Sequence, residues 1–549
     1  SATTIIDGGA IDRIFDVAPN VTLILSDLTI RNGAAEFGAG LRNEVGNVIL
    51  QDVVLTGNVA SGSGTSESHG GAIVNDQGNI QLERVTVTGN SSEQDGGGIY
   101  SFNGFIEIND SSIDGNTSSR FGGGLALNGG TADVIDSTIS SNTAADDGAG
   151  ISAFPGSTLT VGSSTISDNT TEDIGGGIYA LGSNVTITES TVSGNSSGAD
   201  GGGVSIEFSS LQLLRSTVHT NSAGADGGGI VVANGSATVA QSTISGNTAV
   251  ENGGGIANYD GSNLDVTNST IVNNSSEATT GGIWSPGFLS SGNTIVAQNT
   301  DLFGRPDISG TVFSKGSNIF GVNIGILGTV NRLNGDQIGT ANFPLDPLLT
   351  DLLDNGGPTL THVPRIGSVA IDTGRTIDFR NDLSQTAEFW ATDQRGRTRV
   401  LDGNQDDVDR IDVGAAEFYG LTLNAADFGS DLQLSLESEG VEIADNPDNV
   451  SVDSARIYFQ FGNGELDHLR ILGTTIDESL TVEFSNGNPL PFAGIDLLGT
   501  GTTDSDSLSL TGGSSTETAH VFDSEVDGSV TVDGRRIAYT SIENLSDLV

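Results

Sequence analysis

Acidic side chains recur at one position of a repeating segment, and their spacing suits cation binding. Asp200 and Asp226 each lie five residues after a recurrent Asn and are 26 residues apart. If the repeats stack as adjacent coils, the two carboxylates lie about 5 Å apart and repel each other by roughly 1 kcal/mol in water. Carboxylate oxygens are ligands that Ca²⁺ prefers. The row therefore predicts bound Ca²⁺, with residues chosen for turn geometry as the alternative.

A second candidate calcium site is the acidic stretch DGNQDDVD at residues 402–409. Its oxygen ligands would be Asp402, Asn404, Asp406 and Asp409. The stretch lacks the spacing and the terminal Glu of an EF-hand loop. An ordinary acidic turn is the alternative at this place.

Residues that could catalyse a reaction are sparse along the repeat. A calcium-dependent polysaccharide lyase needs a base beside its carboxylates, and between residues 43 and 300 the Arg and Lys residues are Arg84, Arg120 and Arg215. The five His residues are scattered and form no paired metal-binding motif. Carboxylates at the spacing of an inverting glycosidase, about 6.5–9.5 Å, would occur at many points of a stacked acidic edge. The sequence therefore favours a protein that is not an enzyme.

The composition excludes several classes of protein. Seventy acidic and 20 basic residues give a formal net charge of −50 at pH 7, which is too negative for a protein that wraps nucleic acid. Cys is absent, which excludes disulfides, and no run of about 18 apolar residues could form a membrane-spanning helix. The acidity predicts a soluble surface that gains from counterions in a saline or calcium-bearing exterior.

The elements that position these residues come from the repeat itself. Asn recurs at spacings of mostly 26 residues, and each Asn is followed by a Gly cluster, an aliphatic residue and alternating polar and apolar segments. Three short strands cannot bury their apolar sides alone, whereas stacked coils bury them in one column. We therefore expect an all-β, right-handed parallel β-helix with about 26 residues per coil, followed by small C-terminal β modules.

The recurrent Asn is expected to form a ladder whose amide groups bond from coil to coil. A glycan or ligand site is the alternative for this row. The predicted ladder consists of Asn58, Asn90, Asn116, Asn142, Asn169, Asn195, Asn221, Asn247 and Asn274.

The pattern changes along the chain and divides it into three parts. Residues 1–300 carry the β-helix repeat. Residues 301–418 lose the Gly triplets and gain Pro, and are expected to contain the end of the β-helix and a further region. Residues 419–549 alternate as short strands and are expected to form a β-rich module.

Residues 355–417 contain a string of short motifs. These are Asn355-Gly356-Gly357-Pro358-Thr359, Thr361-His362, Asp393-Gln394-Arg395-Gly396 and Asp412-Val413-Gly414-Ala415-Ala416-Glu417. The string resembles the choice-of-anchor Q domain of bacterial surface proteins, and Gly70-Gly71-Ala72-Ile73 is similar to the GGAI-type repeats of polymorphic outer-membrane proteins. The resemblance implies a bacterial surface protein in which a β-helix joins an anchoring region. Val369 stands where that family usually has Pro, and with no sorting signal recognised the mode of anchoring stays open.

These patterns together predict an exported structural protein. The chain begins at Ser1 without Met, and the simplest account is a processed, secreted protein of the cell surface or extracellular space. We expect a homopolymer, a fibre, sheath or matrix joined through solenoid ends or a donated strand. A monomeric adhesin that binds glycans or cells is the alternative, and a polysaccharide lyase or hydrolase is the third. Possible partners are further copies of the chain and cell-surface polysaccharide, without nucleic acid or a membrane span.

Overall fold

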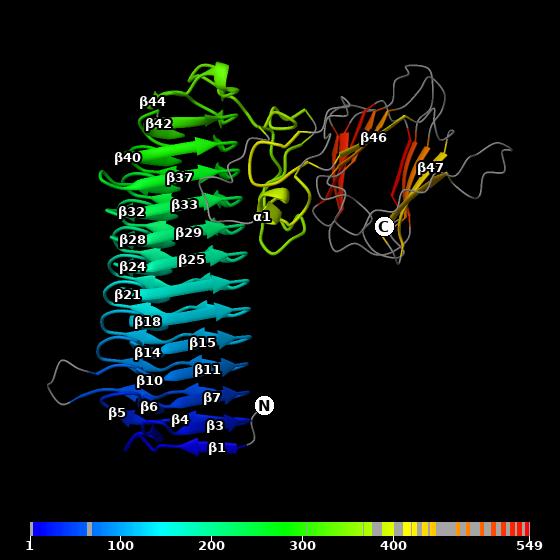
Figure 1. The fold of residues 1–549 in the computed structure, drawn as a ribbon. Helices are drawn as coiled ribbons and strands as arrows, with labels where there is room; N and C mark the ends of the chain where they lie inside the picture. The colour runs from blue at the N-terminus through cyan, green and yellow to red at the C-terminus, as the bar shows by residue number, and fades with distance from the viewer. Residues whose placement is uncertain are drawn as a thin grey trace.

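The computed structural model describes residues 4–62, 68–304, 306–365, 367–375, 387–399 and 410–418, and after these the strands of a C-terminal region. The described residues between 4 and 338 form a parallel solenoid of about 12 turns of roughly 26 residues each (Figure 1). The predicted right-handed parallel β-helix is confirmed.

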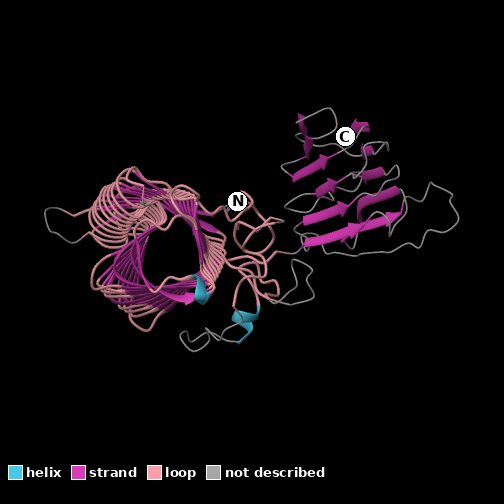
Figure 2. Cartoon of the chain, turned by 90° about the horizontal axis from the view of Figure 1, so that it is seen from above, coloured by secondary structure: helices cyan, strands magenta, loops and turns pink. Residues whose placement is uncertain are grey.

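Most coils contribute strands to three parallel sheets, which stack around a common interior (Figure 2). Sheet A has 14 strands from β1 (Thr4–Asp7) to β45 (Gln337–Ile338), sheet B has 21 strands, and sheet C has 10. One representative coil consists of β26 (Thr191–Ser193) in sheet A, β27 (Ser196–Ser197) in sheet C, and β28 (Val204–Glu207) and β29 (Ser210–Leu214) in sheet B.

The interior is a column of aliphatic side chains in constant register. Ile178 pairs with Val204, and Val204 pairs with Ile230 on the following coil. All three are fully buried in the largest hydrophobic cluster of the described residues. Inward and outward side chains alternate along a strand, so an aliphatic residue at every second position is sufficient to fill the column. Each such side chain contributes about 1.5–3 kcal/mol by its burial.

The Gly triplets solve a packing problem where sheet C turns into sheet B. Gly201 adopts a φ of 67°, which residues other than Gly rarely adopt. A Cβ atom on Gly202 would lie 2.5 Å from the carbonyl oxygen of Ser222, and one on Gly203 would lie 2.6 Å from that of Gly229. The neighbouring coil is therefore too close for any side chain at these two positions.

The stack ends in a shortened coil, and the chain then returns along its side. The last strands are β42 (Ile308–Gly316), β43 (Ile319–Phe320), β44 (Ile326–Gly328) and β45, with the 3₁₀ helix η1 (Arg332–Asn334) between the last two. Residues 345–375, 387–399 and 410–418, which we call the lateral segment, pack against sheet A (Figure 1). They include helix α1 (Ala387–Ala391).

The C-terminal strands form two further sheets of six and five strands, in which parallel and antiparallel pairs are mixed. The strands are β46 (Gly420–Asn424), β47 (Asp431–Glu437), β48 (Gly440–Asp445), β49 (His468–Leu472), β50 (Ser479–Glu483), β51 (Ile495–Leu498), β52 (Ser507–Thr511), β53 (Thr518–Phe522), β54 (Gly528–Val532), β55 (Arg535–Thr540) and β56 (Asn544–Asp547). In the described part of the chain, no helix is long and apolar enough to cross a membrane.

Candidate functional site

The recurrent Asn side chains lie inside the solenoid, stacked one above another. The amide nitrogen of Asn142 donates to Oδ1 of Asn169 at 3.0 Å and to the carbonyl oxygen of Ile113 at 2.9 Å. Its own Oδ1 accepts the backbone N–H and the amide of Asn116, both at 3.0 Å. The same amide-to-amide bond joins the neighbouring coils through Asn58, Asn90, Asn116, Asn142, Asn169, Asn195, Asn221, Asn247 and Asn274. All nine are buried, so their amides hold coils together and present nothing to a glycan.

The ladder ends on an acid. Asn274 bonds to Asn299, and the amide of Asn299 donates to Oδ1 of Asp307 at 3.0 Å. The other carboxylate oxygen of Asp307 accepts the backbone N–H of Val322 at 2.6 Å. Burial raises the pKa of Asp307 to about 7. Sequence reasoning missed this residue, since Asp307 lies eight residues after Asn299 instead of 26.

The two carboxylates of the predicted calcium row are adjacent in the structure. The Tyr259 hydroxyl lies 2.6 Å from Oδ2 of Asp226 and 3.0 Å from Oδ2 of Asp200. The Oδ1 atoms accept backbone N–H groups from the following coil, that of Asp226 at 3.1 Å for Asp200 and that of Asn252 at 2.8 Å for Asp226. Each carboxylate thus serves as a bond between coils, and Tyr259 joins the two.

Burial changes the acidity of two carboxyl groups on this edge of the solenoid, those of Asp200 and Asp147. A tyrosine hydroxyl has one proton and donates to one carboxylate at a time, and its shorter contact is the one with Asp226. Burial raises the pKa of Asp200, and the charge of Asp226 raises it further. Burial likewise raises the pKa of Asp147, on the same edge, to about 6. The corner can bind protons above the usual range of carboxylates.

The structure contains no ready-made metal centre among its described residues, where no three His, Asp or Glu side chains are grouped to hold an ion. The other four predicted calcium ligands, Asp402, Asn404, Asp406 and Asp409, lie outside the described residues. Calcium binding at either place stays a prediction.

Nearer the N-terminal end of the rod, the same edge brings unlike polar groups together. The ring of His69 stacks on Tyr100 with 4.4 Å between centroids, and its Nδ1 lies 3.4 Å from Asp95. The guanidinium of Arg120 lies 3.9 Å from the same carboxylate and 4.6 Å above the ring of Phe121. Tyr100 is buried and the carboxylate of Asp95 is nearly so, whereas Arg120 and Phe121 are partly exposed. A guanidinium over an exposed aromatic ring can bond to the hydroxyl groups of a sugar.

Arg215, one of the three basic residues of the repeat that could serve as the base of a lyase, instead forms hydrogen bonds with the lateral segment. Its guanidinium donates to the carbonyl oxygen of Phe389 at 3.0 Å and to the Thr392 hydroxyl at 2.7 Å. The same group lies 4.7 Å above the Phe389 ring. These contacts occupy Arg215 at the corner between sheets B and A, away from the Asp200 and Asp226 corner.

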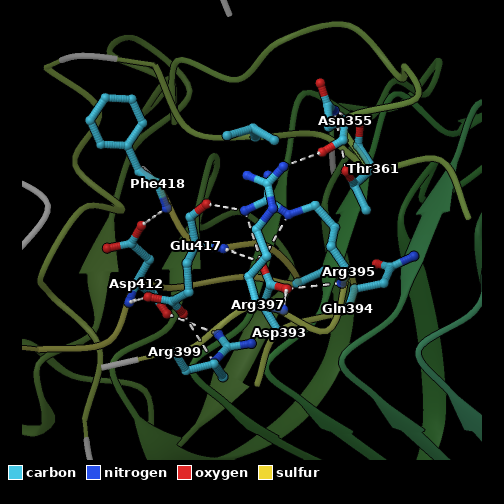
Figure 3. Close-up of polar contacts among 12 residues, drawn as sticks. Asn355, Thr361, Asp393, Gln394, Arg395, Arg397, Arg399, Asp412, Glu417 and Phe418 are labelled. Atoms are coloured by element: carbon cyan, nitrogen blue, oxygen red, sulfur yellow. Dashed lines mark hydrogen bonds and ion pairs between the residues drawn. The ribbon is translucent and has the colours of Figure 1, made fainter. Parts of the chain in front are cut away.

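The motifs between Asn355 and Glu417 converge in one buried polar cluster (Figure 3). Arg395 pairs with Asp393 at 2.8 Å and donates to the carbonyl oxygen of Glu417. The Glu417 carboxylate lies 3.0 Å from Nε of Arg399 and accepts the backbone N–H of Asp412 at 2.8 Å. The motif string is thus the core of the lateral segment, because most of its buried polar groups bond to one another in place of water. Nη1 of Arg399 and Oδ1 of Asn355 have no hydrogen-bond partner among the described residues.

The cluster contains more buried acids than buried bases. Asp393, Asp412 and Glu417 face Arg395 and Arg399, and all five are nearly inaccessible to water. Burial raises the pKa of Asp412 to about 7. Burial also raises the pKa of Glu417, against the opposing charge of Arg399.

The lateral segment docks on the outward Thr residues of sheet A. Gln394 accepts from the hydroxyl of Thr243 at 2.7 Å and donates to that of Thr217 at 2.9 Å. The Thr270 hydroxyl accepts the backbone N–H of Ala415 at 3.0 Å. These Thr residues belong to β34 (Thr243–Ser245), β30 (Thr217–His219) and β38 (Thr270–Val272).

Apolar contacts complete this interface. On the solenoid, Val272 and Ile295 point outward and pack against Ala370 and Val413 of the lateral segment. These outward apolar residues interrupt the Thr-x-Ser alternation of earlier coils, and they are the sequence signal that could have located the interface.

The comparisons with known proteins agree with this fold. Residues 70–244 and 123–301 match the family described as the right handed beta helix region. No curated protein and no solved structure matches the chain. The coil-by-coil register and the family match together identify the chain as a β-helix repeat protein.

Proposed function

We propose that this chain is a non-enzymatic structural protein of a cell surface or extracellular matrix. The observation that carries the proposal is the unbroken ladder of buried Asn side chains, which bonds coil to coil from Asn58 to Asn299. Twelve coils at about 4.8 Å per coil give a rod roughly 60 Å long. A stack bonded at every level resists bending, which suits a spacer or a building unit.

The buried cluster of the lateral segment supports a surface role in particular. The residues that carry the resemblance to the choice-of-anchor Q domain of bacterial surface proteins are those that pack this segment onto the rod. In this proposal the lateral segment fastens the C-terminal strands to a rigid rod. Cys is absent and the charge is −50, both of which suit an extracellular protein stabilised by backbone ladders and counterions.

Labelling of intact cells tests the surface location. Antibodies against the full chain are expected to label unpermeabilised cells of the source organism or their extracellular matrix, and external protease is expected to remove the signal. A control antibody against a cytoplasmic enzyme should label only lysed cells. Labelling of this chain confined to lysed cells would overturn the proposal.

Glycan binding by the rod is the second candidate function, and the partly exposed guanidinium of Arg120 over the Phe121 ring favours it. A glycan array with the full chain tests this role, with Arg120→Ala expected to lose binding and Arg84→Ala, an exposed Arg on another corner, to retain it. Release of cleaved sugar in the same experiment would establish an enzyme instead.

Calcium is the proposed cation of the acidic corner. If it binds at Asp200 and Asp226, millimolar Ca²⁺ raises the melting temperature above that in chelator, because binding to the folded state alone stabilises it. Asp200→Asn with Asp226→Asn should abolish this difference. Equal melting temperatures of the unaltered chain in Ca²⁺ and in chelator would contradict the proposal.

A further inference from the structure

The last coil of the stack exposes large apolar side chains. In residues 321–343, which we call the terminal coil, Leu333 is 98% exposed, Phe343 81% and Leu327 65%. On the coil beneath, Phe303 is 68% exposed. Leu327, Leu333 and Phe343 all belong to this one coil, and apolar side chains that gather on a surface mark interaction sites.

The backbone of the terminal coil is also unpaired on one side. Strand β44 pairs with β42, and β45 pairs with β43, while no described strand pairs with their outer edges. In Figure 1 no described segment lies beyond this coil. Natural sheet edges are protected by charged residues, Pro or a covering element. Strand β44 reads Ile326-Leu327-Gly328 and carries no charge and no Pro.

The terminal coil is formally neutral, as are residues 227–250 and 278–300 of the rod. Its charged residues are Arg332 and Asp336, which cancel, whereas the whole chain carries −50. Asp336 is buried and accepts hydrogen bonds from Ser314 and Asn318. A second acidic molecule can therefore approach this end without the repulsion that it meets along most of the rod.

We propose that the terminal coil is an interface with a second copy of this chain, the two rods joining tail to tail about a two-fold axis. This inference deepens the structural role proposed above by naming the surface through which rods join. A two-fold axis across the rod end brings β44 against its own copy in antiparallel orientation, which sheet hydrogen bonding accommodates. Leu327, Leu333 and Phe343 then form the apolar centre of an interface of standard size, about 800 Å² per partner.

Sedimentation velocity of the full chain between about 1 and 100 µM tests the proposal, with negative-stain microscopy of the same samples. We expect a concentration-dependent dimer that is close to twice the length of a single rod. Leu333→Glu places two carboxylates across the axis and should weaken dimerisation at least tenfold. Its side chain is exposed, so the melting temperature should stay that of the unaltered chain.

The matched control is Phe208→Glu, which replaces an exposed Phe on the side of a middle coil and should leave dimerisation unchanged. Monomers at every concentration, dimers that lie side by side, or unaltered dimerisation of Leu333→Glu would each overturn the inference. A monomer in which the terminal coil is protected from hydrogen exchange would show that another segment of the chain covers it. Monomeric rods at the cell surface would leave the structural role standing, so the two proposals fail separately.

Discussion

Two stretches of the solenoid carry the same repeat in different surroundings. Thr165 and Thr191, on the outward face of sheet A, are partly exposed, whereas Thr243 and Thr270 at the same register are buried. The covered coils differ because the lateral segment lies on them. The outward face of a β-helix coil can therefore meet solvent or become an interface without a change in the coil itself.

Under the lateral segment, outward positions of the repeat carry apolar residues only where that segment packs most closely on the solenoid. Leu214 and Ala240 point outward beside Phe389, and Ile295 takes the place of the repeated Thr. Where the cover is polar, Thr is kept and bonds to Gln394. An interface on a repeat protein is thus marked by a few outward apolar residues against an unchanged background.

Substitution in the buried ion cluster is expected to have the largest effect on the packing of the lateral segment against the solenoid. Arg399→Met leaves Glu417 without its ion-pair partner in a buried site, and breaking such a pair costs about 3–5 kcal/mol. Hydrogen exchange should rise in the lateral segment and in β30, β34 and β38, and stay unchanged in β22 (Thr165–Ser167). Arg84→Met, which breaks an exposed pair with Asp52, is the control and should cost less than about 1 kcal/mol. Equal effects of the two substitutions would contradict the role of the cluster.

Removal of a ladder Asn should lower the free energy of unfolding by a similar amount in the open coils and in the covered coils. Asn142→Ala in an open coil and Asn247→Ala in a covered coil each remove amide bonds from the interior and leave buried partners unsatisfied. We expect a loss of about 2–4 kcal/mol from each, measured by denaturant unfolding. A much smaller loss at Asn247 would mean that the lateral segment, and not the ladder, holds the covered coils.

The pH should act more strongly on the covered stretch and the lateral segment. Asp307 and Asp412 have pKa values of about 7 in the folded chain, against 3.8 for an ordinary Asp, and Asp147 in the open stretch has about 6. The folded state binds these protons more tightly, so their stabilising effect is complete below about pH 4 and is lost as the pH rises through 6 and 7. Calorimetry should show a melting temperature that falls from pH 5 to pH 8.

Asp412→Asn is the matched variant for this measurement. It keeps the shape of the side chain and removes the titration, so the fall in melting temperature should become smaller. A melting temperature that is constant or rises between pH 5 and pH 8 would show that these acids are ionised in the folded chain at no cost.

Removal of an outward Thr hydroxyl should give the smallest difference in stability between covered and open coils. Thr243→Val leaves the buried Gln394 oxygen without its donor and should cost about 1–2 kcal/mol. Thr165→Val, in an open coil, exchanges a solvated hydroxyl for a methyl group and should stay within about 0.5 kcal/mol. Denaturant midpoints of the two variants compare them directly, and equal midpoints would argue against docking through the Thr column.

Much of the coil stack was predictable from the sequence. The 26-residue period, the alternation and the Gly triplets act within one coil or between neighbours, so a repeated local pattern fixes the register of Asn142 on Asn169. The adjacency of Asp200 and Asp226 follows from the same period. The contact of Tyr259 with these carboxylates does not follow from the period, because Tyr259 lies 33 residues after Asp226 and reaches its carboxylate from a later coil.

The period of the sequence by itself determined the solenoid, since each coil repeats the contacts of the one before it. Only the tertiary structure decided how the lateral segment lies on the rod. Arg215 meets Thr392 across 177 residues, and Thr243 meets Gln394 across 151. No periodicity pairs such distant positions. Their contacts depend on the shape and the unsatisfied hydrogen-bonding groups of two surfaces that exist only after each has folded.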